Sequence, residues 1–259
     1  MQEVPFQYDS LGEMDKLHDY ITDYGYLVYC MGYNEVEIAK YWRHVFADTD
    51  GRYSLDDYLA QDLGPDKIAI ALKKLIRLSI VLSFQKQQEQ FANKLVRLTE
   101  EHPEVVTPDV YTCISSGIGR PKSIEYALKA IDLCIESGDK AGEIEAQRIL
   151  GSAYYDAAVN EQDDNYGRMA NREWEKGLEI TKELYGDVHP LVMHAYEDMC
   201  LVCDDDLNKA LDLAFKAHDM AIELYGKDHP LTGRPFHYVG VLYRELKQWD
   251  NALKYFREA

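Results

Sequence analysis

The sequence predicts an all-α fold: a right-handed α-solenoid of stacked helix–turn–helix pairs, preceded by an atypical helical cap. Near the C-terminus, Ala252, Phe256 and Ala259 recur at the i, i+4, i+7 spacing of one helix face. Two similar segments, KELYGDVHP at 182–190 and AIELYGKDHP at 221–230, suggest a repeated joint between helices. Proline and glycine number only 8 and 16, which favours helices over sheets.

Composition argues against several functions. A formal net charge of −18 disfavours a phosphate backbone as ligand, so we expect no nucleic-acid partner. Five scattered cysteines indicate a reducing compartment, and we expect a cytoplasmic protein. The most apolar window, 68–84, contains Lys73, Lys74 and Arg77 and is too short to span a bilayer.

The last repeat unit is the clearest. Gly240 and Tyr243 lie one turn apart on a first helix, a short polar turn follows, and Ala252, Phe256 and Ala259 lie on a second helix. Together with Trp249, assigned to the turn, these residues resemble the signature of the tetratricopeptide repeat. Protein or extended-peptide binding is what that resemblance implies.

Earlier units show the same pattern less completely. In one, Ala210, Ala214 and Ala217 mark a second helix, preceded by a first helix at about 191–203. In the unit before it, the first helix matches at Leu150, Gly151 and Tyr154, and the second contains Ala170, Trp174, Gly177 and Ile180. The connection at 158–169 is longer than the family's turn, so either both helices extend or a loop protrudes.

The N-terminal half follows the repeat less closely. We expect helices near 11–24, 35–46 and 54–61, two helices within 66–101 that break near 83–87, and weaker ones around 108–117 and 127–130. Residues 1–62 are acidic and rich in tyrosine, whereas 67–97 are basic. We therefore expect two domains, 1–62 docked as a cap and 63–259 as the array, with clear repeats from about 120.

The two repeated segments read as joints between repeats rather than catalytic Asp/His pairs. In each, a glycine ends one helix, an acidic residue caps the next, and proline occupies the first turn. The motif resembles the linker of kinesin light chain-type tetratricopeptide repeats. Its structural residues are Gly186, Asp187, His189 and Pro190 in the first copy, and Gly226, Asp228, His229 and Pro230 in the second.

The concave face of such an array is lined by the first helices, which makes it the expected binding surface. A groove of mixed charge would suit a protein partner or an extended peptide. The outward positions predicted to contact that partner are Glu145, Arg148, Ser152, Tyr155, His194, Glu197, Leu201, Asp204, Arg234, His237, Val241 and Arg244.

The function expected is therefore that of an interaction scaffold, with no catalytic residues, cofactor or metal. Residues 48–59 are two residues short of a calcium loop and better fit a turn and a helix capped by Ser54. The pair Cys200 and Cys203 has CxxC spacing but no second pair, so we assign it to packing. Because Ala259 should lie on a packing face without a cap, we expect the array to continue in a longer parent, or the uncapped repeat to self-associate. A regulatory segment of a larger multidomain protein is the alternative.

Overall fold

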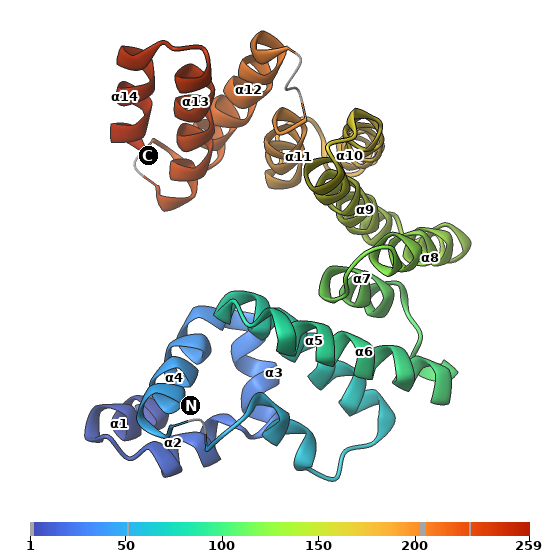
Figure 1. The fold of residues 1–259 in the computed structure, drawn as a ribbon, viewed down its shortest axis with the longest axis vertical. Coiled ribbons are helices and arrows are strands. Elements are labelled where there is room, and N and C mark those ends of the chain that lie inside the picture. The colour runs from blue at the N-terminus through green and yellow to red at the C-terminus, as the bar shows by residue number, and fades with distance from the viewer. Residues whose placement is uncertain (1–2, 51, 203–205, 228) are drawn as a thin grey trace. The chain divides into compact units, whose positions relative to one another are not determined.

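The computed structural model describes residues 3–50, 52–202, 206–227 and 229–259. The chain forms two compact units, residues 1–126 and 127–259, and we describe each by itself. All regular elements in the described residues are helices (Figure 1), so the expected all-α class is confirmed. Within these residues, none of the helices combines the length and apolar character needed to cross a membrane. The expected division at residue 62 stays a prediction.

The first unit is a helical domain in which residues 1–62 and the following helices share one hydrophobic core. Leu17, Trp42, Leu72 and Ile114, from four different helices, are fully buried there. Its elements are α1 (Glu3–Leu11), α2 (Met14–Ile21), α3 (Tyr24–Tyr33), α4 (Glu35–Asp48), η1 (Leu55–Ala60), α5 (Pro65–Leu82), α6 (Gln85–Glu101), η2 (Pro103–Val105) and α7 (Pro108–Gly117).

Two α-helices of this unit, and the short 3-10 helix η2, were not expected from the sequence. The helix expected at 11–24 is α2, and α1 precedes it across Gly12, whose φ is +70°. Helix α3, with the sequence YGYLVYCMGY, was missed because it is apolar on most sides and shows no amphipathic period. The predicted break between α5 and α6 is confirmed at Ser83, which adopts a left-handed conformation with φ of 62°.

The acidic segment contacts the basic helices through ion pairs as well as the core. Arg77 on α5 pairs with Glu35 at the start of α4, with Nη2 3.2 Å from Oε1. Lys94 on α6 pairs with Asp56 in η1. Ser54 and Asp57 form a capping box ahead of η1, as the sequence predicted for this turn.

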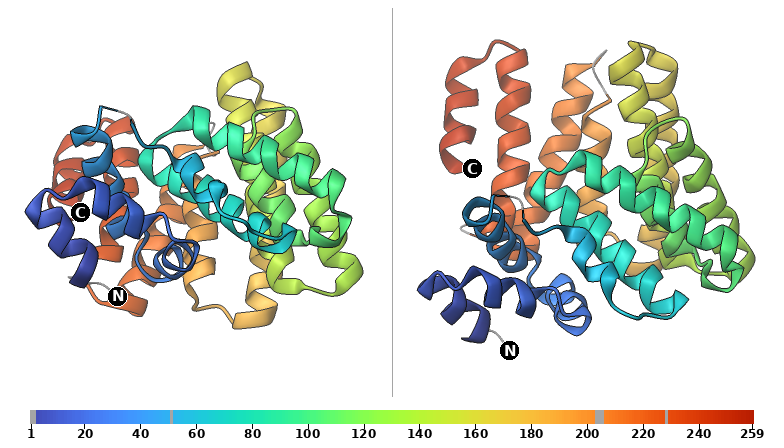
Figure 2. Two further views of the ribbon diagram at one scale, coloured as in Figure 1. Left: turned by 90° about the horizontal axis from the view of Figure 1, so that it is seen from below. Right: turned by 60° about the horizontal axis from the view of Figure 1, so that its bottom comes forward.

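The second unit is a stack of helix–turn–helix pairs. Helix α8 (Lys122–Ser137) crosses the boundary between the units, and Figure 2 shows the pairs that follow it. They are α9 (Lys140–Glu161) with α10 (Asp164–Tyr185), α11 (Pro190–Cys200) with α12 (Leu207–Tyr225), and η3 (Pro230–Thr232) with α13 (Gly233–Glu245) and α14 (Trp249–Glu258). The long connection at 158–169 is explained by extension of both α9 and α10, which turn at Gln162.

Close contact between the two helices of a pair uses a glycine opposite an aromatic ring. A Cβ atom on Gly151 of α9 would lie 2.2 Å from Nε1 of Trp174, and one on Gly240 of α13 would lie 2.6 Å from Cδ1 of Phe256. The Trp174 indole also donates a hydrogen bond of 3.1 Å to the carbonyl of Arg148. In the middle pair, Cys200 is buried, as are Ala210, Ala214 and Ala217.

The joints between pairs are capped by histidine, which corrects the expectation of an acidic cap. Gly186 and Gly226 end α10 and α12 with φ of 87° and 83°, as predicted. In the first joint, Nδ1 of His189 accepts a 3.3 Å hydrogen bond from the Leu191 amide, while Asp187 pairs instead with Lys182 at 3.2 Å.

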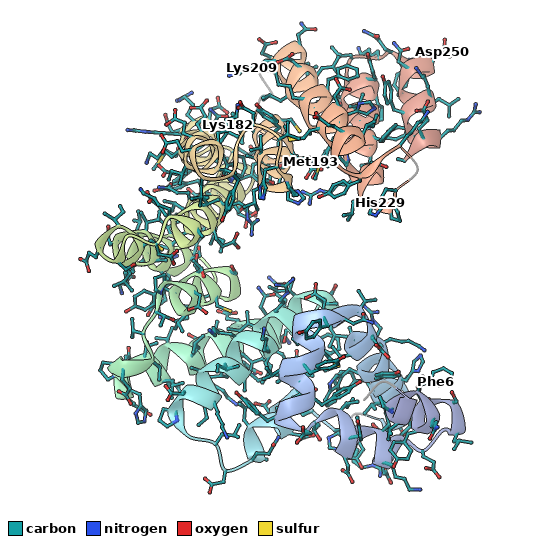
Figure 3. All side chains as sticks on the ribbon, turned by 180° about the vertical axis from the view of Figure 1, so that it is seen from behind. Phe6, Lys182, Met193, Lys209, His229 and Asp250 are labelled. Carbon is teal, nitrogen blue, oxygen red and sulfur yellow. The ribbon has the colours of Figure 1, made fainter. Side chains whose placement is uncertain are left out.

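The second joint repeats this arrangement. Nδ1 of His229 accepts from the Leu231 amide at 3.2 Å, and the position of His229 is shown in Figure 3. Each imidazole also stacks on the preceding tyrosine, Tyr185 or Tyr225. Because Nδ1 accepts in both, the ring proton is on Nε2. The predicted cap Asp228 lies outside the described residues.

Two details at other repeat positions also differ from expectation, and a third residue lies outside the described part of the chain. Trp249 is the first residue of α14 rather than part of the turn, and its side chain is 63% exposed. Ala259 follows α14 and is exposed, instead of lying on a packing face. Cys203, the second residue of the CxxC pair, lies outside the described residues.

Candidate functional site

The first helices of the three pairs in the second unit carry the predicted binding residues at equivalent positions. Aligning Gly151, Cys200 and Gly240 places Arg148 on α9, Glu197 on α11 and His237 on α13 in one row. We call the surface formed around this row on α9, α11 and α13 the groove face. Of its predicted residues, Asp204 lies outside the described part of the chain.

Arg148 is held at the groove face by its own helix. Its Nε and Nη2 donate to the two carboxylate oxygens of Glu145 at 3.0 and 2.8 Å. This bidentate pair, together with Asp198 on α11, raises the pKa of the guanidinium despite partial burial. The side chains of Arg148 and Glu145 remain 43% and 47% exposed, so both are accessible to a partner.

Glu197 was expected to point outward, but its side chain is fully buried. Nδ1 of His194 lies 2.9 Å from Glu197 Oε2, and Nε of Arg234 lies 3.5 Å from the same oxygen. The other oxygen, Oε1, is buried without a hydrogen-bond partner among the described residues. Arg234 comes from α13, so the buried carboxylate attracts a cation from the next repeat.

Asp198 is a groove-face residue that the sequence analysis did not identify. Nη2 of Arg234 lies 4.0 Å from its Oδ1, and the described residues donate no hydrogen bond to its carboxylate. Burial raises the pKa of Asp198 above its usual value, although Arg148 and Arg234 act in the opposite direction. It was missed because only the position before it, Glu197, belonged to the outward row predicted from helical spacing.

The remaining predicted groove residues have varied surroundings. Ser152 donates to the carbonyl of Arg148 in its own helix at 3.1 Å, which satisfies its hydroxyl locally. His237 lies beside the ring of Phe256, with the ring centroids 5.5 Å apart. Val241 is half-buried, and Arg244 is exposed and pairs with its neighbour Glu245 at 2.8 Å.

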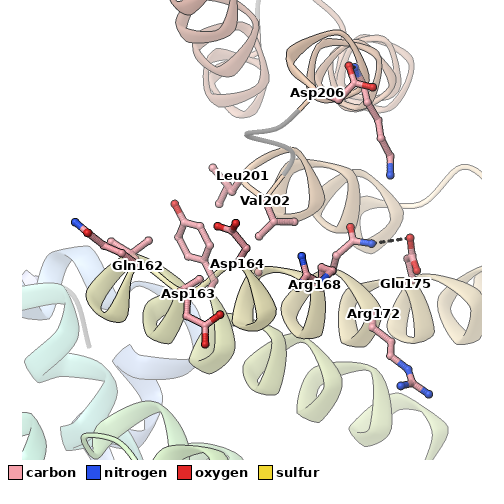
Figure 4. Close-up of a pocket in the computed structure, with 15 residues that line it drawn as sticks. Gln162, Asp163, Asp164, Arg168, Arg172, Glu175, Leu201, Val202 and Asp206 are labelled. Carbon is pink, nitrogen blue, oxygen red and sulfur yellow. Dashed lines mark hydrogen bonds between the residues drawn. The ribbon is translucent and has the colours of Figure 1, made fainter.

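Tyr155 and Leu201, also predicted to face the partner, line a cleft of about 730 Å³ (Figure 4). The cleft lies between the α9–α10 turn and the start of α12, where the longer α9 and α10 extend past α11. Figure 4 shows Gln162 near one end, Asp164 and Val202 toward the middle, and Glu175 toward the other end. Apolar and charged side chains of both signs therefore line the same space.

The titratable side chains of the groove face lie in ion pairs, without a metal-binding arrangement among the described residues. Within the described residues, no group of three or more His, Cys, Asp or Glu side chains is arranged to hold a metal ion. The titratable groups of the groove face, Glu145, His194, Glu197 and Asp198, are engaged with arginines or with each other.

Comparisons with known proteins agree with this class of fold. Residues 199–259 match the tetratricopeptide repeat family, so this part of the chain consists of tetratricopeptide repeats, as its signature predicted. No curated protein sequence matches the chain significantly.

Two solved structures are similar to the chain. One is BtubC (BKLC) from P. vanneervenii, which is 14% identical in sequence. The match covers 90% of this chain and 87% of the BtubC chain, with a TM-score of 0.56. That level of identity supports the fold alone. The other is a protein of Podosopora anserina whose name refers to a kinesin light chain and nearly identical TPR-like repeats. It is 13% identical in sequence, and the match covers 99% of this chain and 95% of that protein's chain. Its TM-score of 0.43 is too low to support an inference.

Proposed function

We propose that this protein is an interaction scaffold that binds an extended peptide or protein segment along the groove face and into the adjoining cleft. The observation that carries the proposal is that three successive first helices each present an accessible side chain on the groove face: Arg148 on α9, His194 on α11 and His237 on α13. A row repeated along a rigid stack can contact an extended chain at several points in register.

The groove face has the chemistry of a specific but adaptable binding surface. Arg148 is half-exposed, and its bidentate pair with Glu145 restricts its orientation, which reduces the entropy lost when a partner binds. The cleft adds apolar side chains such as Leu201 and Val202 next to charged ones. We propose that these surfaces serve binding rather than catalysis. We also propose a reducing compartment such as the cytoplasm, because Cys30, Cys134 and Cys200 are buried as thiols.

A matched pair of charge reversals tests this function. Peptides selected from a random library on the immobilised chain should lose affinity for an Arg244→Glu variant, because Arg244 is exposed on the groove face. They should bind a Lys254→Glu variant normally, since Lys254 is exposed on the second helix α14. Arg148 and Arg234 are less suitable for reversal because they also neutralise Asp198. Equal effects of both reversals would contradict binding at the groove face.

A second contact, self-association through α14, is supported by two exposed apolar side chains. Trp249 is 63% and Leu253 is 49% exposed, and they lie one turn apart. If this surface joins two copies, Leu253→Asp should abolish a concentration-dependent mass increase in analytical ultracentrifugation. Ile135→Asp, at a 59% exposed position on α8, is the control and should leave it unchanged. A monomeric wild-type chain at all concentrations would rule the contact out.

A further inference from the structure

The central part of the groove face carries an excess of negative charge. Three carboxylates, Glu145, Glu197 and Asp198, face two guanidinium groups, Arg148 and Arg234. When His194 is neutral, one negative charge is therefore left without a compensating cation. The charges of Arg148, Arg234, Glu197 and His194 all act on the Asp198 carboxyl.

Carboxylate oxygens of Glu197 and Asp198 also lack hydrogen-bond donors among the described residues. Oε1 of the fully buried Glu197 has no partner among the described residues, and a buried acceptor without a donor is costly. The Asp198 carboxylate, 13% exposed, meets Arg234 only at 4.0 Å and accepts no hydrogen bond from the described part of the chain. The Asp198 carboxylate can thus accept further N–H donors, next to the buried and incompletely paired carboxylate of Glu197.

Arg234 does not occupy this position firmly. Its distances to Glu197 and Asp198, 3.5 and 4.0 Å, allow attraction between charges without a close hydrogen bond. Its hydrogen bond goes instead to the hydroxyl of Tyr238 at 3.2 Å, and its side chain is 56% exposed. The guanidinium can therefore turn aside without breaking a hydrogen bond to either carboxylate.

We infer that the partner places one cationic side chain, a lysine ammonium or an arginine guanidinium, against Asp198 and Glu197 at the centre of the groove face. The inference rests on the proposed function and specifies the chemistry of the bound segment. A cation supplies the missing charge and brings N–H donors to the Asp198 carboxylate, the partly exposed one of the two. An organic cation fits better than a metal ion, because the described residues contain no three-ligand metal cluster.

Peptide libraries with one fixed position provide the test. The immobilised 259-residue chain is exposed to libraries in which a central residue is fixed as Lys, Arg, norleucine or Glu and the flanking residues are random. A charged hydrogen bond formed in a partly buried site should enrich the Lys and Arg libraries about tenfold over norleucine. On the Asp198→Asn variant, peptides from the Lys and Arg libraries should be recovered no better than peptides from the norleucine library. Asp212→Asn, the same change at a residue 64% exposed on α12, should leave the preference intact.

A measurement on the wild-type chain makes the test independent of that variant's folding. In an NMR titration, a selected Lys peptide should lower the pKa of the Asp198 carboxyl, and its norleucine analogue should not. Preference for Glu or norleucine, or a Lys preference that survives Asp198→Asn, would overturn the inference while leaving the proposed function in place. Failure of every library to bind would overturn both.

Discussion

Trp174 on α10 lies directly against Gly151 on α9, so closely that the position of a Cβ atom on Gly151 would fall 2.2 Å from the indole nitrogen. The Gly151→Ala variant should therefore lose about 2–3 kcal/mol of stability, because the buried ring must move to admit a methyl group. The midpoint of urea-induced unfolding measures this loss.

Gly167, on the same helix as Trp174, provides the control. A Cβ atom there would meet nothing within 4 Å, so Gly167→Ala should be neutral or stabilising by up to about 1 kcal/mol through helix propensity. Similar effects of the two changes would show that the contact between α9 and α10 is not as close as described.

The histidine cap predicts a specific rescue. His189→Ala should destabilise the second unit by about 1 kcal/mol because the Leu191 amide loses its acceptor. His189→Asn should retain most of that stability, since an asparagine oxygen can accept the same hydrogen bond. Nitrogen chemical shifts of the imidazole should also show the proton on Nε2, and a proton on Nδ1 would contradict the cap.

Residues 1–62 should be required for the first unit to fold. Deleting them removes buried Leu17 and Trp42 from the shared core and leaves the apolar face of α5 uncovered. We expect residues 63–259 alone to aggregate, or to lose the cooperative unfolding transition of the first unit. A soluble, cooperatively folding 63–259 would contradict the role of 1–62 as a cap.

The ionised Asp198 carboxylate should lower the stability of the fold while it favours binding of the partner. Burial raises the pKa of this carboxyl in the folded chain, so its ionised form destabilises the fold above that pKa, and the cost disappears as pH falls through it. Asp198→Asn should therefore increase the free energy of unfolding at neutral pH, with a gain that shrinks in acid. A loss of stability at neutral pH would show that the pairing with Arg148 and Arg234 outweighs burial.

The sequence predicted the parts of the fold that depend on local pattern. The alanines of α12, the positions of Gly240 and Phe256 on the facing sides of two paired helices and the glycines at the two joints all follow from helical spacing and backbone preference. Helix α3 did not follow, because a helix that is apolar on most sides shows no period.

The candidate site was less predictable because it depends on contacts between repeats. Helical spacing placed Glu197 on the outward row, but Arg234 from the next repeat and His194 bury it. Asp198 was not identified because its environment is set by Arg148 and Arg234, which are distant in sequence. The histidine caps were missed because Asp and Asn are the usual residues at that position.

The most direct test of the account is hydrogen–deuterium exchange of the chain with and without a library-selected peptide. We predict that bound peptide slows amide exchange in α9, α11 and α13, with the largest change around Arg148, Asp198 and Arg234. Protection confined to α10, α12 and α14, or to the first unit, would contradict binding at the groove face.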